Sequence, residues 1–156
     1  MNNDRRKMLK GAGAASVVSV AVAAGLLKPG MVWAAGWNKA AFEARDLAGA
    51  LSAVGGSAGA ESAQITVKAP DIAENGAVVP VEIISAIPGT ERIVLIAEKN
   101  GMPLVADFSL ANGAEGYVST RIKMGATSNV RAVVKAGGKT YTAAKEVKVT
   151  IGGCGG

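Results

Sequence analysis

Cys154 is the only cysteine of the chain, and the sequence contains no histidine. Without histidine, the chain cannot form the Ser-His or Cys-His pairs that activate a nucleophile, nor a structural zinc site of the usual Cys/His kind. A single thiol also excludes a disulfide within the chain. We therefore expect no catalytic residue, no metal site and no cofactor. Cys154 is then the one group that could bind sulfur through a reversible covalent bond.

The residues around this cysteine predict a mobile arm, because two glycines stand on each side of it and glycine has the widest backbone freedom. We expect the arm to be a slim tether that presents the sulfur inside another protein, roughly 10 Å beyond a last strand ending at Ile151. The alternative is a frayed tail with an incidental cysteine, although an exposed thiol oxidises readily outside the cytoplasm. The predicted arm, residues 152–156, consists of Gly152, Gly153, Cys154, Gly155 and Gly156.

The N-terminal segment has the features of an export signal. Arg5 and Arg6, followed by a spacer, two apolar residues and a lysine, are typical of the twin-arginine motif, and residues 11–27 are weakly apolar. Residues 32–34 fit the small-x-small cleavage rule loosely. We predict a cleaved signal peptide over residues 1–34, a mature protein in the periplasm and no membrane association after processing. A membrane anchor is the alternative, but an apolar run of about 17 residues lies at the short limit of a span.

The formal net charge of +5 comes mainly from this leader. Residues 1–34 hold five of the 17 basic side chains and one of the 12 acidic ones, so the remainder carries 12 basic and 11 acidic groups. These groups are scattered along the chain and form no basic stripe that could neutralise phosphates. The composition therefore excludes nucleic acid as a partner.

Residues 35–56 predict a helix. Phe42, Leu47 and Leu51 recur at roughly helical spacing, Asn38 is suited to cap the start, and Gly55 with Gly56 ends the helix. From about residue 63 the apolar period changes to two, which is typical of strands.

The strand pattern predicts a mainly β fold: an immunoglobulin-like β-sandwich of about seven strands with an N-terminal helix, in a body of residues 35–151. Residues 93–97 are apolar on both faces, which indicates a central strand, while Leu104, Ala106, Phe108 and Leu110 are expected on one face. Turns are expected at residues 100–101, 112–113 and 137–138. The predicted strands are residues 65–67, 77–85, 91–98, 104–110, 117–122, 130–136 and 146–151.

Charged side chains in the body are interpreted as solvated surface, and two methionines as packing residues rather than metal ligands. The carboxylates considered are Asp71, Glu74 and Asp107; the cations are Arg121, Lys123 and Arg131; the methionines are Met102 and Met124. None of these residues is expected to perform catalysis.

The end of the chain, V-K-V-T-I-G-G-C-G-G over residues 147–156, resembles that of the SoxY family, the sulfur carriers of the bacterial thiosulfate-oxidising Sox system. The twin-arginine leader agrees with this resemblance. Further segments similar to the family are residues 70–76 with 79–81, residues 103–104 with Phe108, and residues 120–124.

This resemblance implies a non-catalytic carrier whose Cys154 holds the substrate sulfur as a covalent adduct. It implies a heterodimer with a SoxZ-like subunit, which has an immunoglobulin-like fold and no signal of its own. A cytochrome enzyme, SoxXA, would join thiosulfate to the thiol by oxidation, and a hydrolase, SoxB, would release sulfate. In some organisms a sulfane dehydrogenase, SoxCD, would oxidise the remaining sulfur.

Two other functions remain open at this point. One is a ubiquitin-like sulfur carrier that uses its terminal Gly155-Gly156 as a thiocarboxylate, although such carriers work in the cytosol and this chain has an export signal and a mainly β pattern. The other is a periplasmic binding or chaperone module of immunoglobulin-like fold with an incidental cysteine tail, which leaves Cys154 without a role.

Overall fold

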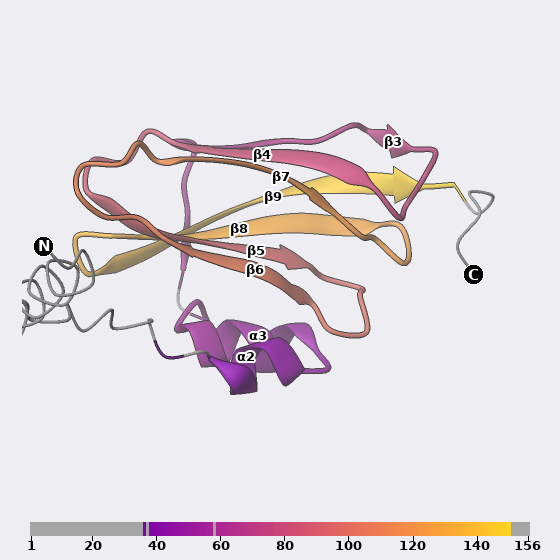
Figure 1. Cartoon of the computed structure of the whole chain (residues 1–156), viewed down its shortest axis with the longest axis horizontal. Coiled ribbons are helices and arrows are strands. Elements are labelled where there is room, and N and C mark those ends of the chain that lie inside the picture. The colour runs from indigo at the N-terminus through magenta and orange to yellow at the C-terminus, as the bar shows by residue number, and fades with distance from the viewer. Residues whose placement is uncertain (1–35, 37, 58, 151–156) are drawn as a thin grey trace, which may run out of the picture. The chain divides into compact units, whose positions relative to one another are not determined.

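The computed structural model describes residues 36, 38–57 and 59–150. The predicted leader over residues 1–34 and the predicted arm over residues 152–156 lie outside the described residues. Within the described part, two short helices precede nine strands arranged in two sheets, as Figure 1 shows. The mainly β sandwich predicted from the sequence is confirmed. No helix among the described residues is long and apolar enough to cross a membrane.

The predicted single helix is two helices, α2 (Lys39–Glu43) and α3 (Leu47–Val54). Asn38 caps α2 as expected, since its side chain accepts a hydrogen bond from the Ala41 amide. The break occurs because Ala44 is extended and Asp46 starts a new helix by accepting the Gly49 amide at 2.8 Å. Gly55 ends α3 in the left-handed conformation, φ 67°, as the sequence indicated.

The smaller sheet has three strands and the larger has six. In the smaller sheet β4 (Val79–Ser85) lies between β2 (Ile65–Lys68) and β7 (Tyr117–Ile122), with both pairings antiparallel. The larger sheet has the order β1-β9-β8-β5-β6, and β3 also pairs with β9. Its strands are β1 (Ala60–Glu61), β3 (Ile72–Ala73), β5 (Thr90–Ala97), β6 (Leu104–Ser109), β8 (Ser128–Ala136) and β9 (Lys139–Val149).

The strand count exceeds the predicted seven because two-residue strands β1 and β3 carry no alternation that a sequence pattern could show. The last strand is also longer than predicted. It begins at Lys139, directly after a two-residue turn in which Gly137 and Gly138 have φ values of 54° and 73°. Two positive φ angles in succession are the geometry of a tight hairpin, so β8 and β9 pair without interruption from Ala136 onward.

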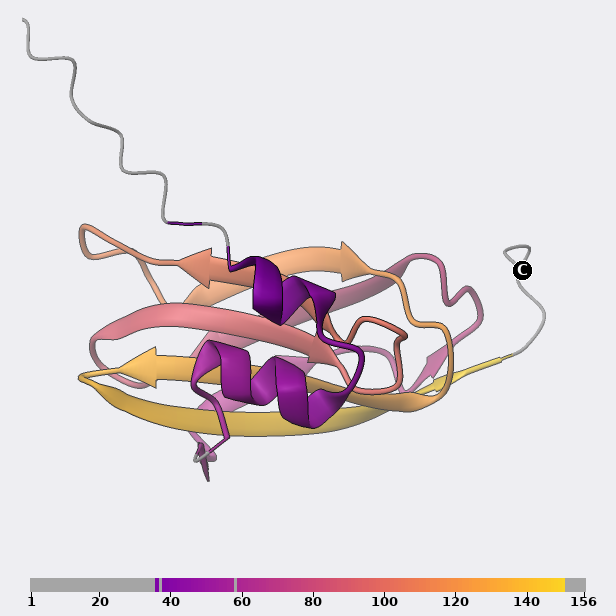
Figure 2. The same cartoon turned by 90° about the horizontal axis from the view of Figure 1, so that it is seen from below.

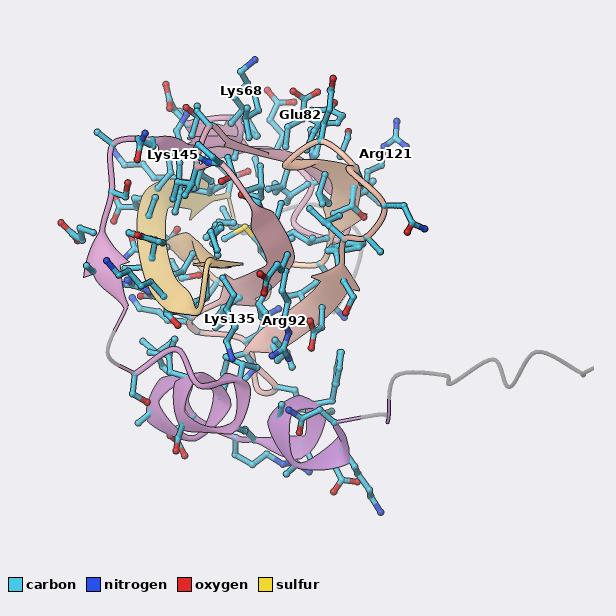
Figure 3. The ribbon with its side chains drawn as sticks, turned by 90° about the vertical axis from the view of Figure 1, so that its left-hand side faces the viewer. Lys68, Glu82, Arg92, Arg121, Lys135 and Lys145 are labelled. Carbon is cyan, nitrogen blue, oxygen red and sulfur yellow. The ribbon has the colours of Figure 1, made fainter. Side chains whose placement is uncertain are left out.

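Two apolar clusters stabilise the body. The larger lies between the two sheets and includes Ile83, Leu95 and Val134. The smaller joins the helices to the outer face of the six-stranded sheet through Ala50, Val94 and other buried side chains. The helices cover this face in Figure 2, while Figure 3 shows Lys68 and Glu82, opposed in the β2–β4 register, on the side away from them.

Residues 93–97 are all buried, which confirms the predicted central strand with apolar faces on both sides. The expectation that Leu104 shares a face with Ala106, Phe108 and Leu110 is wrong. A bulge shifts the β5–β6 register so that Leu95 pairs with Ala106 and Ile96 with Leu104. Leu104 consequently packs in the helix cluster, and the other three side chains pack against the cluster between the sheets.

Candidate functional site

The structure describes the chain as far as Thr150, four residues before Cys154. Every residue predicted for the site lies outside the described residues: Cys154, the glycines Gly152, Gly153, Gly155 and Gly156, and the export residues Arg5 and Arg6. The structure shows the part of the sandwich that directly precedes the segment bearing Cys154 in the chain. This part is a support formed by the end of β9 and its hydrogen-bonded neighbours. We call this support the arm base and define it as residues 147–150 with the segments bonded to them.

On one side, strand β3 fixes the arm base. It pairs with the end of β9 in parallel, with Ile72 opposite Lys148 and Ala73 opposite Val149. The Lys148 amide donates to the Asp71 carbonyl at 2.9 Å, and the Thr150 amide donates to the Ala73 carbonyl at 3.2 Å. This side of the strand is therefore hydrogen-bonded as far as Thr150.

On the other side, the side chain that directly precedes β8 extends the pairing of β8 with β9. The last β8–β9 pair is Ser128 with Val147. Beyond it, the Val149 amide donates to the Thr127 hydroxyl at 2.9 Å, and that hydroxyl lies 3.4 Å from the Val149 carbonyl oxygen. The Thr127 hydroxyl thus bonds Val149 as the backbone of a further β8 residue would. Hydrogen bonds therefore hold the arm base on both sides.

A third segment contacts the arm base through Gly76. The Met124 amide donates to the Gly76 carbonyl at 2.7 Å. A Cβ atom added at Gly76 would lie 2.5 Å from the Met124 carbonyl oxygen and 2.8 Å from a Val149 methyl group. Only a residue without a side chain fits here, so Gly76 permits the turn after β3, the end of β7 and the end of β9 to meet.

An ion pair ties the segment before β3 to β9. The Lys145 ammonium lies 2.9 Å from an Asp71 carboxylate oxygen and donates to the Ala69 carbonyl at 2.6 Å. The hydrogen bond and the charge of Lys145 lower the pKa of Asp71 below its usual value, with a smaller contribution from the charge of Lys148. Because the Asp71 side chain is 88% exposed, water screens this pair and its contribution is modest.

The structure brings together three segments that were singled out in the sequence by their resemblance to one family. Residues 70–76 supply β3 and Gly76, residues 120–124 end at Met124, and residues 147–150 form the end of β9. No sequence pattern indicated Thr127, because its hydrogen bonds to Val149 depend on how the β8–β9 hairpin aligns two segments that are distant in the chain. Lys145 was missed too, because its partner, Asp71, is distant in the chain.

The prediction that charged side chains of the body are solvated is right for some of them and wrong for others. Asp71, Glu74, Arg121 and Lys123 are exposed, as expected. Asp107 and Arg131 are largely buried, each paired across the sheet. Figure 3 labels Arg92, which binds Asp107 through two hydrogen bonds that raise the pKa of Arg92, while Arg131 lies 2.7 Å from Glu98. These pairs occupy the helix-bearing side of the sheet.

The two methionines also differ. Met124 is 2% exposed and packs in the core, as predicted. Met102 is 50% exposed, so the prediction that it is a packing residue is wrong. It lies in the turn between β5 and β6, where the chain has left both apolar clusters. Among the described residues, no group of acidic, histidine or cysteine side chains could hold a metal ion.

Comparison with known families matches the model described as "Sulfur oxidation protein SoxY" to residues 51–154. The chain belongs to the SoxY family. Family membership assigns it a sulfur-carrier role in sulfur oxidation, as a carrier subunit rather than an enzyme. The matched range begins in α3, contains the whole sandwich and extends through Cys154.

Solved structures agree with this assignment. The structure of the sulfur carrier protein SoxY from Chlorobium limicola f thiosulfatophilum is 46% identical, with a TM-score of 0.61, and the alignment covers 68% of this chain and 97% of that one. A superoxide reductase (neelaredoxin) from Ignicoccus hospitalis is 18% identical, with a TM-score of 0.50, covering 56% of this chain and 80% of its own. The second likeness concerns the fold alone. No curated protein sequence matches the chain.

Proposed function

We propose that this protein is a periplasmic carrier that binds thiosulfate-derived sulfur covalently on Cys154 and presents it to the enzymes of the Sox thiosulfate-oxidation pathway. The observation that supports it most is the family match, which extends to Cys154, the chain's only cysteine. The arm base adds a physical argument, because a carrier must separate a fixed body from the group it delivers. Hydrogen bonds hold the chain as far as Thr150, and the glycines flanking Cys154 lie beyond that point.

The proposed loading step joins the Cys154 thiol to the outer sulfur of thiosulfate. One S–S bond forms, one proton leaves the thiol, and two electrons pass to an acceptor, which in the Sox system is the cytochrome SoxXA. The product is a cysteine S-thiosulfonate. Hydrolysis by SoxB then breaks the bond between the terminal sulfone and its neighbour, with water supplying the oxygen of the released sulfate. A persulfide remains on Cys154, which SoxCD oxidises where it is present.

Thiol reactivity in this scheme depends on the partner enzymes. The thiolate is the reactive form, and the arm itself supplies no cationic side chain that would favour it. We infer that each partner enzyme activates Cys154 or its adduct within its own pocket. Glycines 152, 153, 155 and 156 serve this step by leaving the sulfur without neighbouring side chains. Tethering also maintains a high local concentration of a small anion that would otherwise diffuse away.

Two further parts of the proposal rest on the leader and on family resemblance. The Arg5-Arg6 motif supports twin-arginine export to the periplasm, with removal of residues 1–34. The resemblance supports a heterodimer with a SoxZ-like subunit, carried across the membrane by this chain's leader, and transient docking to SoxXA, SoxB and SoxCD.

The Cys154→Ser variant tests the proposal, because it replaces a sulfur nucleophile with a hydroxyl that ionises far above neutral pH. We expect electron transfer from thiosulfate in the reconstituted system to be abolished and intact mass spectrometry to show no sulfur adduct. Wild-type protein should show adducts that a reductant removes. Thr150→Ser, which keeps a hydroxyl at the arm base, is the matched control and should retain full turnover. Thiosulfate oxidation by the Cys154→Ser variant would refute the carrier assignment and leave a docking module with an incidental cysteine.

A further inference from the structure

Three asparagines in the part of the chain that the structure describes are followed directly by glycine, and each lies in a connection between strands. In such a pair, the backbone nitrogen of the glycine can attack the side-chain amide carbon of the asparagine, and the glycine has no Cβ atom to hinder the approach. The resulting cyclic imide is the intermediate of deamidation. The three pairs are Asn75-Gly76, Asn100-Gly101 and Asn112-Gly113.

The Asn100 side chain is held at both of its polar atoms. Its amide nitrogen donates to the Lys123 carbonyl at 2.7 Å, and its amide oxygen accepts the Gly125 amide at 2.9 Å. Ring closure turns the side chain back onto the Gly101 nitrogen, and both hydrogen bonds must break for this to happen. The fold therefore protects Asn100.

The Asn75 side chain is held at one atom, and the glycine that follows it is tightly packed. The Asn75 amide oxygen accepts the Ala77 amide at 2.9 Å. The Gly76 carbonyl accepts the Met124 amide at 2.7 Å, and a Cβ atom added at Gly76 would lie 2.5 Å from the Met124 carbonyl oxygen. Ring closure requires the peptide between Asn75 and Gly76 to rotate, and this packing leaves little room for that rotation.

Neither kind of contact holds Asn112. Its side chain is exposed and forms no hydrogen bond with the described residues. An added Cβ atom at Gly113 meets nothing within 4 Å, and the Ala114 amide closes the turn by donating to the Ala111 carbonyl at 3.1 Å. Asn112 has a φ of 56°, a conformation that a residue with a side chain adopts at a cost. The turn can therefore rearrange and let the Gly113 nitrogen approach the Asn112 side chain.

We propose that Asn112 is a deamidation site of the mature protein, and that the fold keeps Asn75 and Asn100 intact. The Gly113 nitrogen forms a bond to the Asn112 amide carbon, the bond from that carbon to Nδ2 breaks, and ammonia leaves with the proton of the Gly113 amide. Water then opens the imide at either carbonyl and gives aspartate or isoaspartate. The net reaction consumes water and releases ammonia, and it requires no oxidant. This inference does not depend on the carrier function.

The modification changes the end of the sandwich opposite the arm base. Figure 1 shows the connection between β6 and β7 at the left, away from the end of β9. Asn112 and Glu91 both line a surface hollow at this connection, and the Leu110 amide donates to the Glu91 carbonyl at 2.8 Å. A carboxylate at position 112 adds negative charge to a hollow that Glu91 already lines, and isoaspartate also lengthens the backbone of the turn. The arm base stays unmodified, because its own asparagine, Asn75, is protected.

The test uses the mature protein as it is purified from cells, incubated at mildly alkaline pH, where the attacking nitrogen loses its proton more readily. Digestion at acidic pH followed by mass spectrometry measures the conversion of each asparagine over time. We expect Asn112 to convert at least about tenfold faster than Asn75 or Asn100, since those two must first break hydrogen bonds. In urea the three rates should become similar, because each asparagine precedes a glycine. A rate at Asn75 or Asn100 in the folded protein that equals or exceeds the rate at Asn112 would overturn the proposal.

Two variants locate the site independently. Glutamine forms the corresponding larger ring far more slowly, so Asn112→Gln should remove most of the isoaspartate that protein isoaspartate methyltransferase labels in the incubated protein. Asn75→Gln, an exposed position in another turn, is the matched control and should leave the labelling unchanged. Circular dichroism checks that both variants are folded, and the wild-type digest decides alone if either is not. Undiminished labelling of folded Asn112→Gln protein would place the modification elsewhere and contradict the proposal.

Discussion

At the scale of single residues, Lys145 ties the segment before β3 to the strand that ends in the arm base. It reaches from β9 to Asp71 and to the Ala69 carbonyl, and so holds the segment before β3 against the strand that precedes the arm. In the same segment, the Asp71 and Ala73 carbonyls accept hydrogen bonds from the Lys148 and Thr150 amides. A surface ion pair that contributes little energy can therefore still affect where the arm begins.

The Asp71–Lys145 pair predicts a pH dependence. Because the folded protein lowers the pKa of Asp71, the pair stabilises the fold above the usual pKa of aspartate, about 4, and this contribution is lost as the pH falls through the lowered value. Asp71→Asn should unfold at a lower temperature than wild type at pH 7, and the difference should shrink as the pH is lowered below about 4. Thermal denaturation followed by circular dichroism measures this.

Glu74→Gln is the control for this prediction, since Glu74 is exposed in the same segment and its carboxylate forms no salt bridge with the described residues. The unfolding temperature of Glu74→Gln should match that of wild type at pH 7 and at acidic pH. A difference between Asp71→Asn and wild type that stayed constant with pH would show that the Asp71 charge is not the cause.

The sequence predicted the exposure of individual charged side chains less well than it predicted the strands. Asp107 and Arg131 alternate with inward residues and were expected in solvent, yet both are paired on the sheet face that the helices partly cover. Alternation identifies the face on which a side chain lies, but it does not indicate whether another layer covers that face. The partners, Arg92 and Glu98, come from a neighbouring strand whose register the sequence does not contain.

At the scale of elements, the short strand β3 matters more than its length suggests. Its two residues pair with the last part of β9, beyond the point where the pairing of β9 with β8 stops. Pro70 and the absence of alternation hid this strand from sequence analysis, whereas the longer strands β4, β5, β7 and β8 were predictable because each shows a clear apolar pattern. The arm base is therefore the part of the site that only the structure shows.

Gly76 offers a test of how firmly these elements must meet. Gly76→Ala puts a methyl group 2.5 Å from the Met124 carbonyl oxygen, closer than atoms can approach, so the turn, β7 or β9 must shift. We expect a loss of about 1–3 kcal/mol in the free energy of unfolding, typical of overpacking, and faster amide exchange at Val149 and Thr150. Urea denaturation and hydrogen exchange measure the two effects.

Gly101→Ala is the matched control, because an added Cβ there meets nothing within 4 Å. It should leave stability nearly unchanged or slightly increase it by restricting the unfolded chain. Equal stability of the Gly76 and Gly101 variants would contradict the tight packing at the arm base.

At the scale of the whole molecule, the helix-covered face of the larger sheet and the end that carries the arm base differ in character. The helices cover the outer face of the six-stranded sheet, and their packing gives that face an apolar layer of its own. The end that carries the arm base instead leaves Ile72, Val78 and Met102 exposed, and exposed side chains of both charges, such as Lys148, Glu74 and Glu146, lie there too.

The export proposal also concerns the whole molecule, because the twin-arginine route carries proteins that are already folded. The described body has a continuous core between its sheets and no buried side-chain polar atom without a hydrogen-bond partner, so it is suited to fold before export.

Replacing Arg5 and Arg6 together with lysine keeps the positive charge but removes the motif. We expect the variant to accumulate in the cytoplasm with residues 1–34 still attached, as measured by cell fractionation and intact mass. Replacement of Lys7 and Lys10 with arginine retains the arginine pair and should permit normal export. Delivery of processed double-lysine variant to the periplasm would show that another route carries the protein.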